Sequence, residues 1–314
     1  MSFREAELAA LAARMGEQLL RQRLARERDA HLAPALPVGE VLAAHHLRGS
    51  GRAIHLVLTL CGLRGVGRRN AHAIELRQHA LKLPRLPAAF EGFTLLHLSD
   101  LHIDAGERYL QALVERVQGV SCDACVLTGD FRFGTRGSSA PAIAALARLL
   151  PALPATTFAV LGNHDDLALG LGLEALGVRV LMNEAEALQR GGESMHIAGI
   201  DDAHYFRTHD LARARAGVPP DGCALLLSHT PQPYREAAAH GFAGMLCGHT
   251  HGGQICLPGG IPLLTEARAP RRLARGSWRF GTMAGYTSVG CGCSIVDARF
   301  FCPPEVTVHT LQRA

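Results

Sequence analysis

The sequence has no stretch of about 18 or more apolar residues, so it predicts no membrane-spanning helix. Its longest apolar run, AIHLVLTLCGL at 53–63, is too short to span a bilayer and contains a histidine. The opening residues, MSFREAELAA, lack the basic-then-apolar layout of a signal peptide. The nine cysteines are odd in number, and several lie in apolar runs, as reduced, buried cysteines do. These features favour a globular protein of the cytoplasm.

Charged residues are also few, at 19% against 48% hydrophobic, and 314 residues suffice for one large α/β domain with a smaller addition. The charge is unevenly placed. Residues 1–90 hold 14 Lys and Arg against 7 Asp and Glu, whereas residues 91–314 hold 18 against 21. A basic N-terminal region predicts contact with an anionic surface, which is a membrane, a nucleic acid or a phosphorylated ligand.

Residues 5–30 predict one helix, because Leu8, Leu11, Met15 and Leu19 recur at helical spacing. The polar face is rich in arginine. Two interpretations follow: the helix lies on an anionic membrane, or it packs on its own domain with a solvated basic face. We expect a basic, mainly helical extension over residues 1–72 and a main domain over 73–314. That domain begins with an alternating segment, AIELRQHALKL, typical of an edge strand.

From residue 93 onward, short apolar runs alternate with polar clusters. FTLLHL is followed by SDLH, CVL by TGD, TFAVL by GNHD, MHIAGI by DD, CALLL by SH and AGMLC by GHTH. Helical stretches separate several of these runs. The pattern predicts an α/β fold whose polar residues gather at the carboxyl ends of buried strands, where open α/β sheets bind ligands.

The side chains at these strand ends are oxygen and imidazole donors, which suits a divalent transition metal. In D-x-H and H-x-H, we expect two side chains one residue apart in an extended segment to point the same way. The candidate residues are Asp100, His102, Asp130, Asn163, His164, Asp165, His229, His249 and His251.

Five motifs in this order resemble the calcineurin-like metallophosphoesterases: SDLH at 99–102, GD at 129–130, GNHD at 162–165, SH at 228–229 and GHTH at 248–251. GHTHGGQICLPGG and the PPE segment near the C-terminus also resemble one bacterial branch of that family. The resemblance implies a four-layer αββα sandwich with a two-metal site. It implies that Asp100, His102 and His251 hold one metal, that Asn163, His229 and His249 hold the other, and that Asp130 bridges them.

The resemblance also implies hydrolysis of a phosphodiester or pyrophosphate bond by metal-activated hydroxide, with His164 facing the substrate. Mn²⁺ is the expected metal, with Fe or Zn as alternatives. Arg132 is either a phosphate clamp or a solvated loop residue, and Asp202 orients groups near the substrate or forms a turn. Asp165 is expected in a turn or a supporting hydrogen bond.

The substrate and partners stay open between several hypotheses. The bacterial branch includes enzymes that hydrolyse UDP-2,3-diacylglucosamine in lipid A synthesis, and residues 1–30 would then contact the inner face of the membrane. Soluble nucleotides or a nucleic acid are the alternative substrates, although a net charge of +4 gives little footprint for a long nucleic acid. A non-catalytic scaffold is a further alternative. The sequence does not set the oligomeric state.

Overall fold

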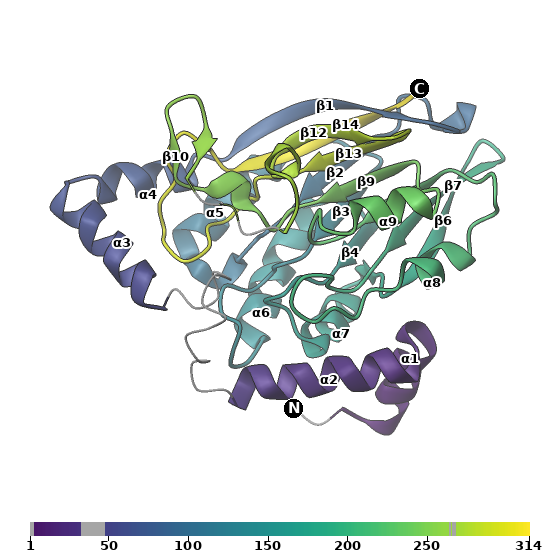
Figure 1. The fold of residues 1–314 in the computed structure, drawn as a ribbon, viewed down its shortest axis with the longest axis horizontal. Helices are drawn as coiled ribbons and strands as arrows, with labels where there is room; N and C mark the ends of the chain where they lie inside the picture. Colours follow the sequence, from purple (N-terminus) through teal and green to yellow (C-terminus); the bar gives the residue numbers. More distant parts are fainter. Residues whose placement is uncertain (1–2, 33–47, 264, 266–267) are drawn as a thin grey trace.

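The computed structural model describes residues 3–32, 48–263, 265 and 268–314. Two six-stranded mixed sheets form its centre (Figure 1). The first sheet has the order β1-β14-β2-β3-β4-β5, and the second has the order β12-β13-β9-β8-β7-β6. The strands of the first sheet are β1 (Glu75–Leu83), β2 (Thr94–Leu98), β3 (Ala124–Thr128), β4 (Thr157–Val160), β5 (Arg179–Val180) and β14 (Glu305–Arg313). Those of the second are β6 (Glu184–Arg190), β7 (Glu193–Gly199), β8 (Ala224–Leu227), β9 (Gly244–Cys247), β12 (Gly276–Phe280) and β13 (Met283–Thr287).

The centre of each sheet is parallel, with β2, β3 and β4 side by side in one sheet and β7, β8, β9 and β13 in the other. β14 lies between β1 and β2, parallel to the former and antiparallel to the latter. Because parallel strands all end at one edge, the loops that follow β2, β3, β4, β8 and β9 converge there.

Three apolar clusters separate four layers. Leu95, Val126 and Leu225 belong to the cluster between the two sheets. A second cluster joins the first sheet to α5 (Glu107–Val117), α6 (Ala140–Leu149) and α7 (Leu167–Ala175), and a third joins the second sheet to α8 (Leu211–Ala216) and α9 (Tyr234–Ala239). The predicted αββα sandwich is confirmed. Each of the six apolar runs predicted to be strands forms a strand, and β1 is the predicted edge strand.

The single helix predicted over residues 5–30 is wrong, because the chain forms α1 (Glu5–Met15) and α2 (Glu17–Leu32) with Gly16 between them at φ 87°. A left-handed residue ends a helix, and glycine adopts it without strain. The apolar stripe packs inward: Leu11, Met15 and Leu20 lie in the cluster beneath the first sheet. Figure 1 shows both helices along the edge near α7.

The arginine face of these helices is only partly solvated. Arg23 is fully buried, donates to the Asp165 carbonyl at 2.7 Å and lies 3.4 Å from the Asp201 carboxylate. Its guanidinium also covers the Phe206 ring. Of the two interpretations, packing on the chain's own domain therefore describes α1 and α2, but the basic face serves partly as an internal anchor.

Two further helices, α3 (Arg48–Leu60) and α4 (Arg64–His72), precede β1 and lie at another end of the molecule (Figure 1). A small hairpin of β10 (Cys256–Leu257) and β11 (Ile261–Pro262) lies near them. The predicted extension over 1–72 thus divides between two places, and its segment 33–47 lies outside the described residues. Among the helices that the structure describes, none is long and apolar enough to cross a membrane.

Candidate metal centre

The loops after β2, β3, β4, β8 and β9 bring the seven predicted metal ligands together in the buried space at the sheet edges. Each of the seven is at most 6% exposed. Six of them form two groups, each with ligand atoms within 4.8 Å of one another, and a third group of His102, Asp130 and His164 shares one residue with each of the two. The first group is Asp100, His102 and His251; the second group is Asp130, His229 and His249.

In the first group, two imidazoles face one carboxylate. His102 Nε2 lies 3.3 Å from His251 Nε2, which lies 3.4 Å from Asp100 Oδ1. His102 Nδ1 donates to the Arg132 carbonyl at 2.9 Å, so its Nε2 carries a lone pair. Burial lowers the pKa of His102 to about 4 and holds the pKa of His251 well below its usual value. Both rings are therefore neutral, as a metal ligand must be.

In the second group, one nitrogen faces three possible co-ligands. His229 Nε2 lies 3.0 Å from Asn163 Oδ1, 3.1 Å from His249 Nδ1 and 3.3 Å from Asp130 Oδ2. Its Nδ1 donates to the Thr128 carbonyl at 2.8 Å, which fixes the ring. The structure thus places Asn163 beside this group, as the resemblance implies.

Asp130 and His164 lie where the two groups meet. Asp130 Oδ2 is 4.0 Å from His102, 3.3 Å from His229 and 3.8 Å from His164. His164 is the more accessible residue, with a side chain 15% exposed. Its Nδ1 donates to the Phe133 carbonyl at 2.8 Å, so Nε2 turns toward Asp130 and is free of a proton when the ring is neutral.

The protonation states of Asp130 and His229 depend on the charged residues that face them. Burial acts to raise the pKa of Asp130, but the His229 and His164 imidazoles hold it well below its usual value. Burial acts to lower the pKa of His229, but Asp130 and Asp100 raise it to about 10. A cation between them would replace that proton, because a ligating imidazole must be neutral. The oxygen and nitrogen donors fit a divalent transition metal.

The backbone is strained at the ligands. Asp100, His102, Asp130, His249 and His251 all have positive φ, between 41° and 70°. A non-glycine residue held there costs on the order of 1–3 kcal/mol, and such residues cluster at functional sites. The reasoning that D-x-H and H-x-H are extended was therefore wrong. The first pair, with left-handed residues at Asp100 and His102 on either side of Leu101, shares one group, and the second pair divides between the two groups.

Glycines leave room for these turns. A Cβ at Gly248 would overlap the Ser99 hydroxyl and the Asp100 carboxylate, and one at Gly162 would overlap Asp130. The GN and GH motifs hence need glycine because ligand atoms occupy the position of a side chain.

The structure shows what surrounds the two residues that were expected to contact the substrate. Arg132 is 2% exposed, and its guanidinium donates to Gly134, Gly137, Ser139 and Asp166. These acceptors hold the guanidinium, so Arg132 is not a solvated loop residue. The Asp202 carboxylate accepts the backbone N–H groups of residues 204, 205 and 206, and so forms a turn.

Asp165 has the expected supporting role. Its carboxylate accepts the backbone N–H groups of Gly162, Asp130 and Phe131 at 2.8–2.9 Å. It therefore connects the loops that carry Asn163 and Asp130. Two contacts were missed by sequence reasoning: His204, whose ring lies 4.3 Å from that of His249, and Arg299, which is fully buried and lies 3.3 Å from His251 Nδ1. Neither belongs to a motif, so no local signal marked them.

A chain of hydrogen bonds also reaches Asp100 from the surface. Ser99 donates to Asp100 Oδ2 at 2.7 Å, and Thr128 donates to Ser99 at 2.7 Å. His97 Nε2 lies 2.9 Å from the Thr128 hydroxyl, and His97 Nδ1 lies 3.2 Å from His309 Nε2. At the outer end, His309 Nδ1 lies 2.8 Å from His79 Nδ1, and His79 Nε2 lies 2.6 Å from the Ser277 hydroxyl.

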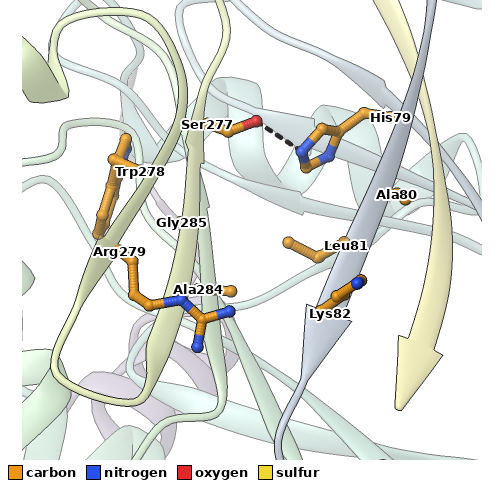
Figure 2. A pocket seen from close by; sticks show the side chains of 9 residues that line it. All are labelled: His79, Ala80, Leu81, Lys82, Ser277, Trp278, Arg279, Ala284 and Gly285. Atoms are coloured by element: carbon orange, nitrogen blue, oxygen red, sulfur yellow. Dashed lines mark hydrogen bonds between the residues drawn. The ribbon is translucent and has the colours of Figure 1, made fainter. Parts of the chain in front are cut away.

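This chain has one consistent direction. A carboxylate only accepts hydrogen bonds, so each hydroxyl must donate its one hydrogen bond in the direction of Asp100. Burial lowers the pKa of His97 to about 3 and also lowers those of His309 and His79, so all three rings are neutral. His97 and His309 must then carry the proton on Nε2, and His79 on Nδ1. Figure 2 shows the outer end, where His79 and Ser277 line a pocket of about 390 Å³ between β1 and β12.

Comparison with known proteins agrees with this geometry. The sequence model of the calcineurin-like phosphoesterases matches residues 93–253, more than half of the chain. The chain belongs to this family. It is 28% identical to the uncharacterized metallophosphoesterase YkuE of Bacillus subtilis, over 77% of this chain and 86% of that protein. It is 32% identical to the phosphodiesterase YaeI of Escherichia coli, over 50% of this chain and 58% of that one.

A solved structure, the phosphopantetheinyl hydrolase PptH of Mycobacterium tuberculosis, matches with a TM-score of 0.41 at 13% identity. The match covers 64% of this chain and 89% of that chain. Family membership and the clustered ligands establish a hydrolase of the metallophosphoesterase class with a divalent metal centre.

Proposed function

We propose that the two groups hold two divalent cations, with Mn²⁺ as the first choice and Fe or Zn as alternatives, and that the chain hydrolyses a phosphodiester or pyrophosphate bond. The position of Asp130 carries this proposal, because its carboxylate faces residues of both groups. When bound, two such cations would supply Lewis acidity and would lower the pKa of a bound water to about 7. The GHTHGGQ motif supports the further proposal that the chain belongs to the bacterial branch that it resembles.

His164 is the proposed proton donor to the leaving oxygen. The Phe133 carbonyl holds its Nδ1–H, so a second proton on Nε2 would point into the centre. Asp130 lies 3.8 Å from that nitrogen and stabilises the protonated ring. Asp130 also accepts the backbone N–H of His164 at 2.9 Å, which fixes the ring's position relative to both groups.

The decisive test is hydrolysis of bis(p-nitrophenyl) phosphate by the Mn²⁺-loaded protein and by His164→Ala. We expect kcat to fall by about 10²–10⁴-fold in the variant, with unchanged metal content. Equal loss of metal would instead make His164 a ligand of the group that it forms with His102 and Asp130. Full activity in the variant would contradict its role as proton donor.

A lipid-linked substrate such as UDP-2,3-diacylglucosamine is the finer proposal. Exposed apolar side chains on α3 and on the β10–β11 hairpin support it, because an acyl chain needs an apolar surface. Release of UMP, lost in His164→Ala, would support it. Cleavage of the aryl phosphodiester alone would favour soluble nucleotides as substrates. Absence of both activities in the metal-loaded protein would favour a scaffold.

A further inference from the structure

The described chain gathers its exposed large hydrophobic side chains in one region. Ten of 14 such residues lie on α3, α4 and the turn between them, on the segment 257–263 and on the segment 295–301. On α3, Leu56 and Val57 are each 57% exposed and Leu60 is 77% exposed. Isolated apolar residues on a surface are ordinary, but a gathered set marks an interaction site. We call this set the apolar face.

The apolar face is continuous because its segments share one small core. Leu58 of α3 is buried with Val296 and Ala298, and Ile54, Ile255 and Phe300 pack around them. The backbone also joins the segments, since Ile255 pairs with Phe300. The outward residues of the same elements, such as Leu257 and Phe301, are 48% and 57% exposed. Figure 1 shows α3, α4 and β10 at one end of the molecule, away from α1 and α2.

Positive charge borders this face. The sequence has no Asp or Glu from Val41 to Ile74. Arg64 and Arg69 of α4 are exposed. On the other side, the exposed Arg275 donates to the Gly260 carbonyl in the hairpin. A neighbouring acid, Asp297, lies 3.1 Å from Arg68 and is neutralised by it.

This combination selects the partner. A second copy of the chain would bring arginines against arginines, whereas an anionic lipid surface accepts both the charge and the apolar side chains. The face also adjoins the metal centre: Gln254 donates to the carbonyls of Ser294 and Val296, and Arg299 of the same segment contacts His251 of the first group. We propose that the apolar face docks the protein on a membrane containing anionic lipid.

The proposal relocates the expected membrane contact from residues 1–30, whose apolar stripe is buried, to α3, α4 and the hairpin. Its meaning for catalysis rests on the proposed function, since docking would hold the metal centre beside a lipid-linked phosphoester. Membrane docking itself needs no turnover, so the docking proposal and the proposed hydrolysis can each be refuted without the other.

The test is sedimentation with vesicles of phosphatidylglycerol and phosphatidylcholine, compared with phosphatidylcholine alone. We expect the full chain to bind the anionic vesicles, and binding to weaken with salt. Leu56→Gln/Leu60→Gln should lower binding about tenfold or more, and Arg64→Gln/Arg69→Gln should lower binding only to the anionic vesicles. Leu76→Gln/Leu176→Gln is the control, since these leucines are exposed outside the apolar face, at 37% and 36%, and their replacement should leave binding unchanged.

Each variant is also assayed for melting temperature and for cleavage of bis(p-nitrophenyl) phosphate. Both should stay at wild-type values, which separates docking from folding and from the proposed function. Wild-type binding by the Leu56→Gln/Leu60→Gln variant would overturn the proposal, as would an absence of binding by the wild-type protein. A concentration-dependent dimer that the same variant abolishes, without vesicle binding, would identify a second copy as the occupant and would equally overturn it.

Discussion

Replacing His97 by phenylalanine tests whether the hydrogen-bonded chain orients Asp100. The imidazole is fully buried and joins Thr128 to His309. Phenylalanine removes the donor to the Thr128 hydroxyl and leaves the His309 Nε2–H without its acceptor. One unsatisfied buried group costs about 1–3 kcal/mol, so the free energy of unfolding should fall by that amount.

The effect on metal affinity follows from the supporting role of the chain. Ser99 holds Asp100 Oδ2, which leaves Oδ1 toward His251. Loss of a group that supports a metal ligand costs about 10–100-fold in affinity. We therefore expect Mn²⁺ affinity, measured by titration against a competing chelator, to fall by that factor in the first group.

Three controls make this result specific. His97→Gln keeps an amide donor for Thr128 and should retain most of the affinity. His196→Phe replaces another buried histidine, which lies on β7 and takes no part in this series of hydrogen bonds, and should leave metal binding unchanged. ¹⁵N NMR should place the proton on Nε2 of His97 and His309. Wild-type affinity in His97→Phe, or a proton on His97 Nδ1, would refute the reasoning.

Three other perturbations follow from the contacts. Gly248→Ala puts a methyl group against two side chains of the first group and should abolish metal binding there, whereas Gly217→Ala, in open space, should bind metal normally. Arg23→Met leaves buried carboxylates without their positive partner, so the free energy of unfolding in urea should fall by about 3–5 kcal/mol. The exposed Arg21→Met should lower it by at most about 0.5 kcal/mol. His229, with a pKa of about 10 before metal binds, must lose its proton to bind metal, so affinity should rise between pH 7 and pH 10. Calorimetry in two buffers should detect that proton at pH 7, and its absence would contradict the assignment of His229.

The strand ends were predictable because the signal is local. A short apolar run followed at once by polar residues specifies a buried strand and its ligand-bearing loop, as at SDLH and GNHD. The site residues came together because parallel strands share one carboxyl edge. The conformation of those loops was not predictable by the same rule, since D-x-H reads as extended unless the left-handed turns at Asp100 and His102 are known.

Contacts between distant segments account for the other differences. Arg23 appears on a basic helical face, and only the fold brings the Asp201 carboxylate to it. The chain from His79 to Asp100 joins β1, β14, β2 and β3, whose adjacency no motif encodes. Likewise, the sequence indicated membrane contact for the apolar stripe of α1, but the structure buries that stripe and exposes apolar side chains of α3.

The central claim is that two cations share Asp130. We would load the protein with Mn²⁺, count the bound metal by mass spectrometry and record its electron paramagnetic resonance spectrum beside that of Asp130→Asn. We expect about two ions per chain with an exchange-coupled spectrum in the wild-type protein. The Asp130→Asn variant should lose both the exchange coupling and the phosphodiester hydrolysis. A single bound ion in the wild-type protein, or an unchanged coupled pair in Asp130→Asn, would contradict it.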